Sequence, residues 1–250
     1  MPELIEIERY RRLAEGVVGR TVARADAPDA WFLKRGLTAR AVRVAVAGTT
    51  VVRCRRIGKL LLVDLRARAG EEPVLGLRFG MTGRLLVDSE DRHPWDRFAL
   101  HFDGGGDLRI RDPRRLGGVE LDPDEGRLGP DALSLTRPAL ADALRGSVAP
   151  VKARLMDQSR IAGLGNLLVD ETLFRAGIDP TRTAATLDPE ARRKLHRSIR
   201  STLNHTMRRG GSHTGRLPRD LEAPCPKCGA PIRRRTVAGR TTYSCSRHQR

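Results

Sequence analysis

The chain has 250 residues, a formal net charge of +17 and 39% hydrophobic residues. This length can hold two domains with separate cores, and so large a positive charge opposes folding and predicts a polyanionic partner. No apolar run reaches the roughly 18 residues that span a bilayer, and Pro2, Glu3, Glu6 and Glu8 do not resemble a signal peptide. Composition therefore excludes a membrane protein, and we expect a cytoplasmic one.

The first predicted element is an amphipathic helix that begins after Leu4. Ile7, Tyr10 and Val17 recur at helical spacing, and Gly19 can close the helix in the left-handed conformation. This helix leaves the first residues of the chain outside it.

A β-rich region follows, from about residue 21 to residue 121, where the hydrophobic period changes to two and Gly, Asp and Pro separate short apolar runs. One such run contains Val42, Val44 and Val46. The pattern predicts an antiparallel sandwich or barrel. Residues 122–138 are rich in Pro, Gly and Asp and indicate a linker, so we place the N-terminal domain at 1–124.

The second half of the chain predicts helices. Short helices fit residues 138–145 and 151–158, and Asn166 is placed to cap a third helix that runs to Ala176. The clearest helix has Asp188 as its cap and Pro189 in its first turn, and it ends at Gly210. We therefore expect an α+β protein with a helical domain over 125–215 and a last domain over 216–250.

The last domain carries a metal-binding motif. Its ligands follow the pattern C-x2-C-x16-C-x2-H and are Cys225, Cys228, Cys245 and His248. Close-spaced pairs let the side chains converge on one ion, and three thiolates with one imidazole form a closed, structural zinc site. His248 is the least secure ligand because it lies two residues from the end of the sequence. The single Cys54 is more typical of a packed core thiol.

Basic residues concentrate in the same region. Residues 208–250 contain eleven basic and two acidic side chains, and Arg233, Arg234, Arg235 and Arg240 lie between the two ligand pairs. A hairpin there would present these arginines to phosphates, which predicts that this last domain, a zinc finger over 216–250, binds DNA. A solvated run of charge is the competing explanation.

Two further segments contain residues that could react with a substrate or bind an anion. With Met1 removed, Pro2 would offer a secondary amine of lower pKa than a lysine, able to condense with an aldehyde carbon, and Glu3 beside it could act as general acid. Most Met-Pro starts are inert. Residues 159–166, SRIAGLGN, predict an anion site at a helix N-terminus, with Asn166 as an additional donor. A tight turn between packed helices explains this segment equally well.

Taken together, the motifs resemble the formamidopyrimidine-DNA glycosylase and endonuclease VIII family of bacterial base-excision repair enzymes. They run in order along the chain: MPELIEIE at the start, RIGKLLL from 56, RFGMTGRL from 78, RDPRRLGG from 111, LMDQSRIAGLGNLLVDETLFRAGIDP from 155, and the finger. The resemblance implies an N-terminal helix with an antiparallel β-sandwich, then a helix-two-turn-helix domain with a C-terminal β-hairpin zinc finger.

The resemblance also implies an activity and a set of roles. The enzyme would remove an oxidised base through a Schiff base on Pro2 and nick the strand by β,δ-elimination, with Glu3 as general acid and Lys59 as phosphate contact and proton donor. The implied DNA contacts are Met81, Arg114, Leu116, Lys152, Asn166 and Arg240, with Glu6 and Glu171 also near the active site. We expect one structural Zn²⁺, no small-molecule cofactor, damaged double-stranded DNA as partner, a nucleoid-associated location and a monomer.

This sequence departs from the family pattern at several points. Ile5 replaces a proline, Leu116 stands where phenylalanine is frequent, and His248 replaces a cysteine. The interval from Gly211 to Cys225 is much shorter than in the formamidopyrimidine branch, so we expect poor handling of 8-oxoguanine and a preference for formamidopyrimidines, oxidised pyrimidines or abasic sites. The alternatives are a non-catalytic zinc-finger protein that binds DNA damage and a sequence-reading transcription regulator.

Overall fold

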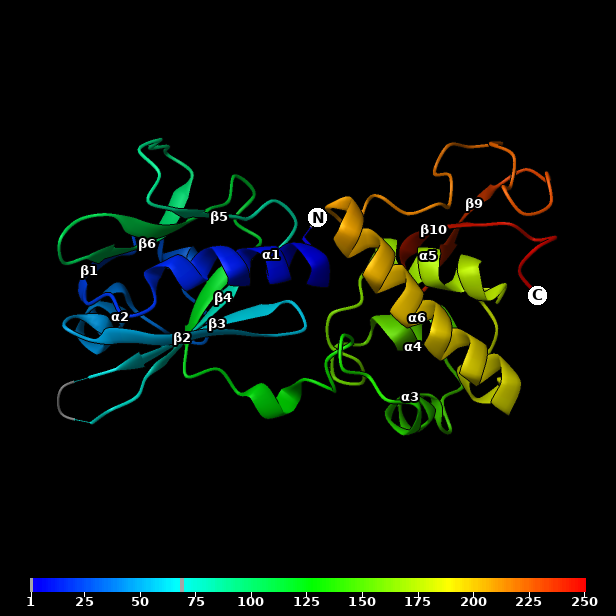
Figure 1. The fold of residues 1–250 in the computed structure, drawn as a ribbon, viewed down its shortest axis with the longest axis horizontal. Helices are drawn as coiled ribbons and strands as arrows, with labels where there is room; N and C mark the ends of the chain where they lie inside the picture. The colour runs from blue at the N-terminus through cyan, green and yellow to red at the C-terminus, as the bar shows by residue number, and fades with distance from the viewer. Residues whose placement is uncertain (1, 68–69) are drawn as a thin grey trace. The chain divides into compact units, whose positions relative to one another are not determined.

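The computed structural model describes residues 2–67 and 70–250 (Figure 1). These residues form two compact units. Pro2 and Glu6–Glu125 belong to the first unit, and Glu3–Ile5 with Gly126–Arg250 form the second. The boundary lies inside the segment expected to be a linker, and the finger lies within the second unit. None of the described helices is long and apolar enough to cross a membrane.

The first unit is built from helix α1, Leu4–Ala14, most of which it contains, and two four-stranded antiparallel sheets. One sheet has the order β1-β6-β7-β5, formed by Val22–Asp26, Asp96–Phe102, Asp107–Arg111 and Arg84–Val87. The other has the order β2-β3-β4-β8, formed by Thr50–Ile57, Leu60–Arg66, Val74–Arg78 and Gly118–Leu121. Both sheets are fully antiparallel, as the period of two predicts.

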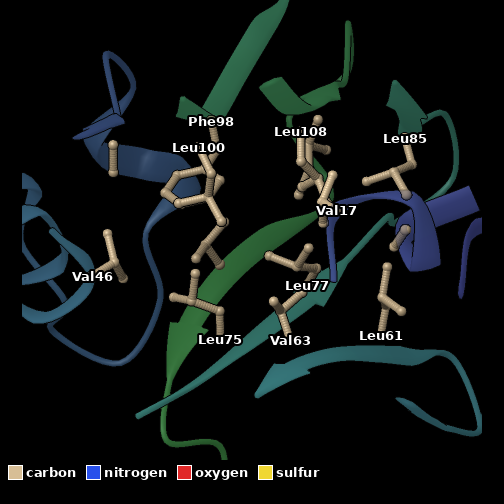
Figure 2. Close-up of a cluster of buried hydrophobic side chains, with 14 of the residues drawn as sticks. Val17, Val46, Leu61, Val63, Leu75, Leu77, Leu85, Phe98, Leu100 and Leu108 are labelled. Atoms are coloured by element: carbon tan, nitrogen blue, oxygen red, sulfur yellow. The ribbon is translucent and has the colours of Figure 1, made fainter. Parts of the chain in front are cut away.

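The two sheets enclose one hydrophobic core. Figure 2 shows Phe98, Leu100 and Leu108 from one sheet facing side chains of the other sheet, among them Leu75 and Leu77. Each such side chain, fully buried, stabilises the fold by about 1.5–3 kcal/mol. The predicted sandwich is confirmed.

One predicted strand is wrong. The run containing Val42, Val44 and Val46 forms helix α2, Ala39–Val46, whose N-terminus is capped by the Thr38 side chain. Val42 and Val46 are buried and Val44 is 74% exposed, because positions four apart share a helix face and the position between them does not. Over so short a run, Val42 and Val46 fit one face of a strand and one face of a helix equally well.

The second unit contains four α-helices of its own and a β-hairpin. The helices are α3 Arg137–Leu144, α4 Val151–Met156, α5 Asn166–Ala176 and α6 Pro189–Arg209. The longest, α6, has the predicted ends: the Asp188 carboxylate accepts the backbone N–H of Ala191 at 2.8 Å, and Gly210 closes the helix at a φ of 90°. The apolar faces of the helices pack around a second core.

The hairpin ends the chain. Strands β9, Arg233–Val237, and β10, Arg240–Ser244, pair antiparallel. Ala238 and Gly239 connect them with φ values of 48° and 72°, which is the two-residue turn that matches the twist of paired strands. The β-hairpin predicted between the two ligand pairs is therefore confirmed.

Candidate nucleic-acid interface and metal centre

Glu3 is buried and its carboxylate is held at the start of α5. Its two oxygens accept the backbone N–H groups of Leu167 at 2.8 Å and of Leu168 at 3.2 Å. These are free donors of a helix N-terminus, and they stabilise a negative charge there. Pro2 directly precedes Glu3 in sequence, is half-buried and lies outside α1. Met1, whose removal is predicted, lies outside the described residues.

The anion site predicted at residues 159–166 is therefore filled by the protein itself. A Cβ on Gly165 would lie 2.3 Å from the Glu3 carboxyl carbon, so only glycine leaves room for this carboxylate. The predicted cap is also wrong: Gly165 takes the cap position and Asn166 is the first helical residue. The sequence pattern identified the helix N-terminus correctly but not the anion that occupies it.

Asn166 faces the hairpin. Its Nδ2 donates to the Thr241 carbonyl at 3.0 Å, and its Oδ1 is buried with no hydrogen-bond partner in the described part of the chain. Thr241 follows Arg240, the exposed first residue of β10. The two predicted phosphate-binding residues are thus joined through the backbone of one strand.

Lys152 is buried rather than exposed. Its ammonium donates to Asp170 Oδ1 at 2.7 Å, to Thr242 Oγ1 at 2.6 Å and to the Thr241 carbonyl at 3.1 Å. Burial lowers the pKa of Lys152 and raises the pKa of Asp170, against the stabilising effect of their ion pair. The prediction that Lys152 contacts DNA is not compatible with this burial, because its donors are committed inside the protein; it holds β10 against α4 and α5.

Lys59 lies in the two-residue turn that joins β2 to β3. Its neighbour Gly58 has a φ of 58°, a left-handed conformation that glycine adopts without strain. Lys59 is half-buried. The lysine is therefore carried by the turn of a β-hairpin.

Met81, Arg114 and Leu116 lie on two adjacent loops of the first unit. Met81 is 42% exposed and Leu116 is 50% exposed, and Arg114 is exposed as well. The loops touch closely, because a Cβ on Gly80 would lie 2.4 Å from the backbone carbon of Leu116. The structure thus brings together three of the residues predicted to contact DNA.

Asp112, which the sequence analysis did not single out, organises both loops. Its buried carboxylate accepts the Thr82 hydroxyl at 2.5 Å, the Arg114 N–H at 3.1 Å and the Gly117 N–H at 2.8 Å. One side chain thereby links the loop of Met81 to the loop of Arg114. The only signal in the sequence is an aspartate before proline, a frequent start of a turn.

Three thiols form the candidate metal centre. The sulfur atoms of Cys225, Cys228 and Cys245 all lie within 4.8 Å of one another. The backbone N–H groups of Lys227 and His248 donate to the sulfurs of Cys225 and Cys245, both at 3.4 Å. Burial raises the pKa of Cys245, but the backbone N–H groups of His248 and Arg247 and the neighbouring thiols outweigh it and lower that pKa overall. The set can hold a metal ion.

His248 stands apart from this cluster. Its Nε2 is 2.8 Å from the Phe174 carbonyl, and its ring packs edge-on against the Phe174 ring at 5.1 Å. The cluster of potential ligands in the described residues contains the three cysteines alone. The fourth ligand stays a prediction.

The hairpin arginines are not equivalent. Arg235 pairs with Asp179 at 2.7 Å, whereas Arg233, Arg234 and Arg240 are exposed. The hairpin thus offers three exposed guanidinium groups to solvent, where phosphate oxygens could be bound.

Two family models match this chain. Residues 1–119 match the formamidopyrimidine-DNA glycosylase N-terminal domain, and residues 128–216 match the helix-two-turn-helix domain of the same enzymes. The chain belongs to the formamidopyrimidine-DNA glycosylase family. It is an enzyme of this family, a DNA glycosylase, and catalysis is favoured over the non-catalytic alternative.

Similar proteins extend over the whole chain. Formamidopyrimidine-DNA glycosylase of Paracoccus denitrificans is 35% identical over 98% of both chains, and that of Thermus thermophilus is 37% identical over 98% of this chain and 97% of its own. Among solved structures, Lactococcus lactis Fpg with abasic-site DNA has a TM-score of 0.86 at 27% identity, and MutM with carbocyclic 8-oxo-G DNA has 0.87 at 28%, each covering 100% of both chains.

Proposed function

We propose that this family member acts as a monomer on damaged duplex DNA, in the cytoplasm with the nucleoid, as a bifunctional glycosylase and abasic-site lyase for oxidised bases. The observation that carries the proposal is Glu3: a buried carboxylate, held by two N–H groups, directly follows a half-buried proline at the start of the chain. A structural role alone would not require the proline.

The chemistry begins with the Pro2 nitrogen, free once Met1 is removed. Its lone pair attacks C1′ of the damaged nucleotide, and the bond from C1′ to the base breaks with its electrons leaving on the base. Glu3 accepts the amine proton and returns one to the sugar ring oxygen, which opens the ring and leaves an iminium. Loss of a C2′ proton then expels the 3′ phosphate, and a second elimination expels the 5′ phosphate, with Lys59 at the phosphate.

The DNA contacts divide between two tasks. The damaged nucleotide must leave the stack, and Met81, Arg114 and Leu116 would fill the space it vacates. Asn166 and Arg240 would bind the phosphates that flank the lesion, since backbone contacts fix the register of the duplex. Lys152 supports these two residues from inside the protein.

Borohydride trapping on abasic-site DNA tests the nucleophile. We expect a covalent adduct from the protein with Pro2 at its N-terminus, confirmed by mass, and none from Pro2→Gly or from protein that retains Met1. Lys194→Gln, which removes an exposed amine on α6, is the matched control and keeps the adduct. A wild-type protein that binds damaged DNA and gives no adduct would support the non-catalytic alternative.

The metal is proposed to be one structural Zn²⁺, bound by Cys225, Cys228, Cys245 and His248. Because Nε2 of His248 is engaged with the Phe174 carbonyl, Nδ1 is the nitrogen left for the ion, and such an outer hydrogen bond is common for metal-bound histidine. Bound zinc supplies folding energy to the finger. Elemental analysis should find one zinc per chain, none in Cys228→Ser and weaker retention in His248→Ala; equal retention in His248→Ala would remove it from the ligand set.

Lesion preference is proposed to favour formamidopyrimidines, oxidised pyrimidines and abasic sites over 8-oxoguanine. The segment from Gly211 to Cys225 is short, and the Glu171 carboxylate fixes its backbone near the beginning. This carboxylate accepts the N–H groups of Arg216 and Leu217, each at 2.8 Å. The alignment with the Bacillus licheniformis relative runs over 280 residues against 250 here, so that relative has residues without a counterpart. Cleavage of single-lesion duplexes tests this; selective excision of 8-oxoguanine opposite cytosine would refute it.

A further inference from the structure

A basic cavity lies between the C-terminal parts of α5 and α6 and the segment that follows α6. Its volume is about 550 Å³. Its lining includes Arg175, Ser201, Asn204, Arg208, Arg209 and Arg216. His205 also lines it and is held through Nε2 at 3.2 Å from the Thr214 carbonyl. No carboxylate is among the lining residues.

Arg175 forms the inner wall of this cavity. Its Nε donates to Glu171 Oε1 at 2.5 Å and its Nη1 donates to Ser201 Oγ at 3.2 Å. Its Nη2 is buried and has no hydrogen-bond partner among the residues that the structure describes. A buried guanidinium donor without an acceptor is unfavourable, so an acceptor from outside the chain would complete it.

The exposed arginines add charge that the chain does not neutralise. Arg208, Arg209 and Arg216 are exposed, and none of them pairs with a carboxylate within residues 2–67 and 70–250. The negative end of α6 would account for Arg208 and Arg209, which lie in its last turn. It accounts neither for Arg216, which lies beyond the helix, nor for the unpaired nitrogen of Arg175.

We propose that this cavity is a second phosphate-binding site. Guanidinium groups bind phosphate oxygens with paired, charge-assisted hydrogen bonds, and Ser201 and Asn204 supply neutral donors. Arg175 lies nine residues beyond Asn166 on α5, roughly 13 Å along the axis at about 1.5 Å per residue. The site is therefore separate from the phosphate contacts proposed for the lesion, and it does not depend on the chemistry of Pro2.

Titration with inorganic phosphate at constant ionic strength tests for the site. We expect phosphate to shift the Nε–Hε NMR signal of Arg175 saturably, and the double variant Arg208→Gln/Arg216→Gln to weaken this binding at least tenfold. The control is Arg193→Gln/Arg197→Gln, which removes the same charge from exposed positions earlier on α6 and leaves the binding unchanged. Equal weakening by both double variants would mean that only general charge attracts the ion and would overturn the proposal.

The phosphate could belong to free phosphate compounds or to the DNA backbone, and an undamaged duplex separates the two. If the DNA backbone fills the site, inorganic phosphate competes with the duplex for binding. Arg208→Gln/Arg216→Gln then reduces the slope of log affinity against log salt by about 2 relative to Arg193→Gln/Arg197→Gln, because each phosphate contact contributes about 0.9 to the slope. If a free phosphate compound fills it, the slopes agree while inorganic phosphate still binds. No phosphate binding together with equal slopes would refute both forms.

Discussion

The predicted DNA-contacting residues of the two units are constructed differently. In the first unit, Met81, Arg114 and Leu116 are exposed side chains on loops, and the buried carboxylate of Asp112 fixes the loop backbone. In the second unit, Asn166 bonds directly to the hairpin and buried Lys152 supports the same strand, so a predicted DNA contact is itself part of the packing. Predicted recognition and stability are therefore separable in the first unit and coupled in the second.

The largest expected effect comes from the buried ion pair. Lys152→Met leaves Asp170 buried without its ammonium and should lower the free energy of unfolding by about 3–5 kcal/mol, measured by urea denaturation. Exposed Lys194→Met is the control and should change little. Adding Asp170→Leu to Lys152→Met should recover much of the lost stability. If Lys152→Met alone were as stable as wild type, Lys152 would not be structural, and the contrast between the two units would fail.

A smaller loss is expected for the residue that holds the first-unit loops. Asp112→Ala removes the acceptor of three hydrogen bonds and should cost about 1–3 kcal/mol. Binding to lesion-containing duplex should weaken as well, because both loops lose their anchor. Asp103→Ala, at an exposed turn between β6 and β7, provides the reference. Unchanged binding in Asp112→Ala would show that the loops need no common support.

Glu3 is expected to serve both stability, as a helix cap, and catalysis, as a proton-transfer group. Glu3→Gln replaces one acceptor with an NH₂ group that faces a helix N–H, and should cost about 0.5–2 kcal/mol, as loss of a helix cap does. Excision should fall further, by about 10²–10⁴-fold, which is the usual contribution of a positioned proton-transfer group. Glu190→Gln, exposed at the start of α6, controls for charge. A loss of stability without loss of excision would leave Glu3 a cap only.

The smallest effect on stability is expected for the exposed loop residues. Arg114→Ala and Leu116→Ala should each stay within about 0.5 kcal/mol of wild type, because neither side chain is buried. Their effect should appear in DNA-binding measurements instead, as a changed preference for the base opposite the lesion. If either variant lost stability comparable to Asp112→Ala, the separation between recognition and support in the first unit would be wrong.

Local signals predicted much of the fold. The caps of α6, the turn of the finger and the strand period each depend on residues close in sequence, and each was predictable. Helix α2, Ala39–Val46, was not, because its apolar spacing fits either a strand or a helix and only packing decides between them. Likewise, the burial of Lys152 beside Asp170 could not be predicted, because its partners are distant in sequence.

The candidate site shows the same limit. The cysteine spacing predicted the cluster of three thiols, since ligands two residues apart converge without help from the rest of the chain. Neither Asp112 nor the capping role of Glu3 could be predicted, because their partners come from other segments. Family resemblance assigned residues to roles, and it did not distinguish a residue that touches DNA from one that holds such a residue in place.

The bond from Glu3 to the start of α5 has a consequence for biosynthesis. The contact spans 164 positions of the chain, and at about 5–20 residues per second a ribosome needs roughly 10–30 s to make that length. During this time the Glu3 carboxylate has no α5 backbone to bind. The contact that joins the beginning of the chain to the second unit therefore forms only late in synthesis, after α5 has emerged.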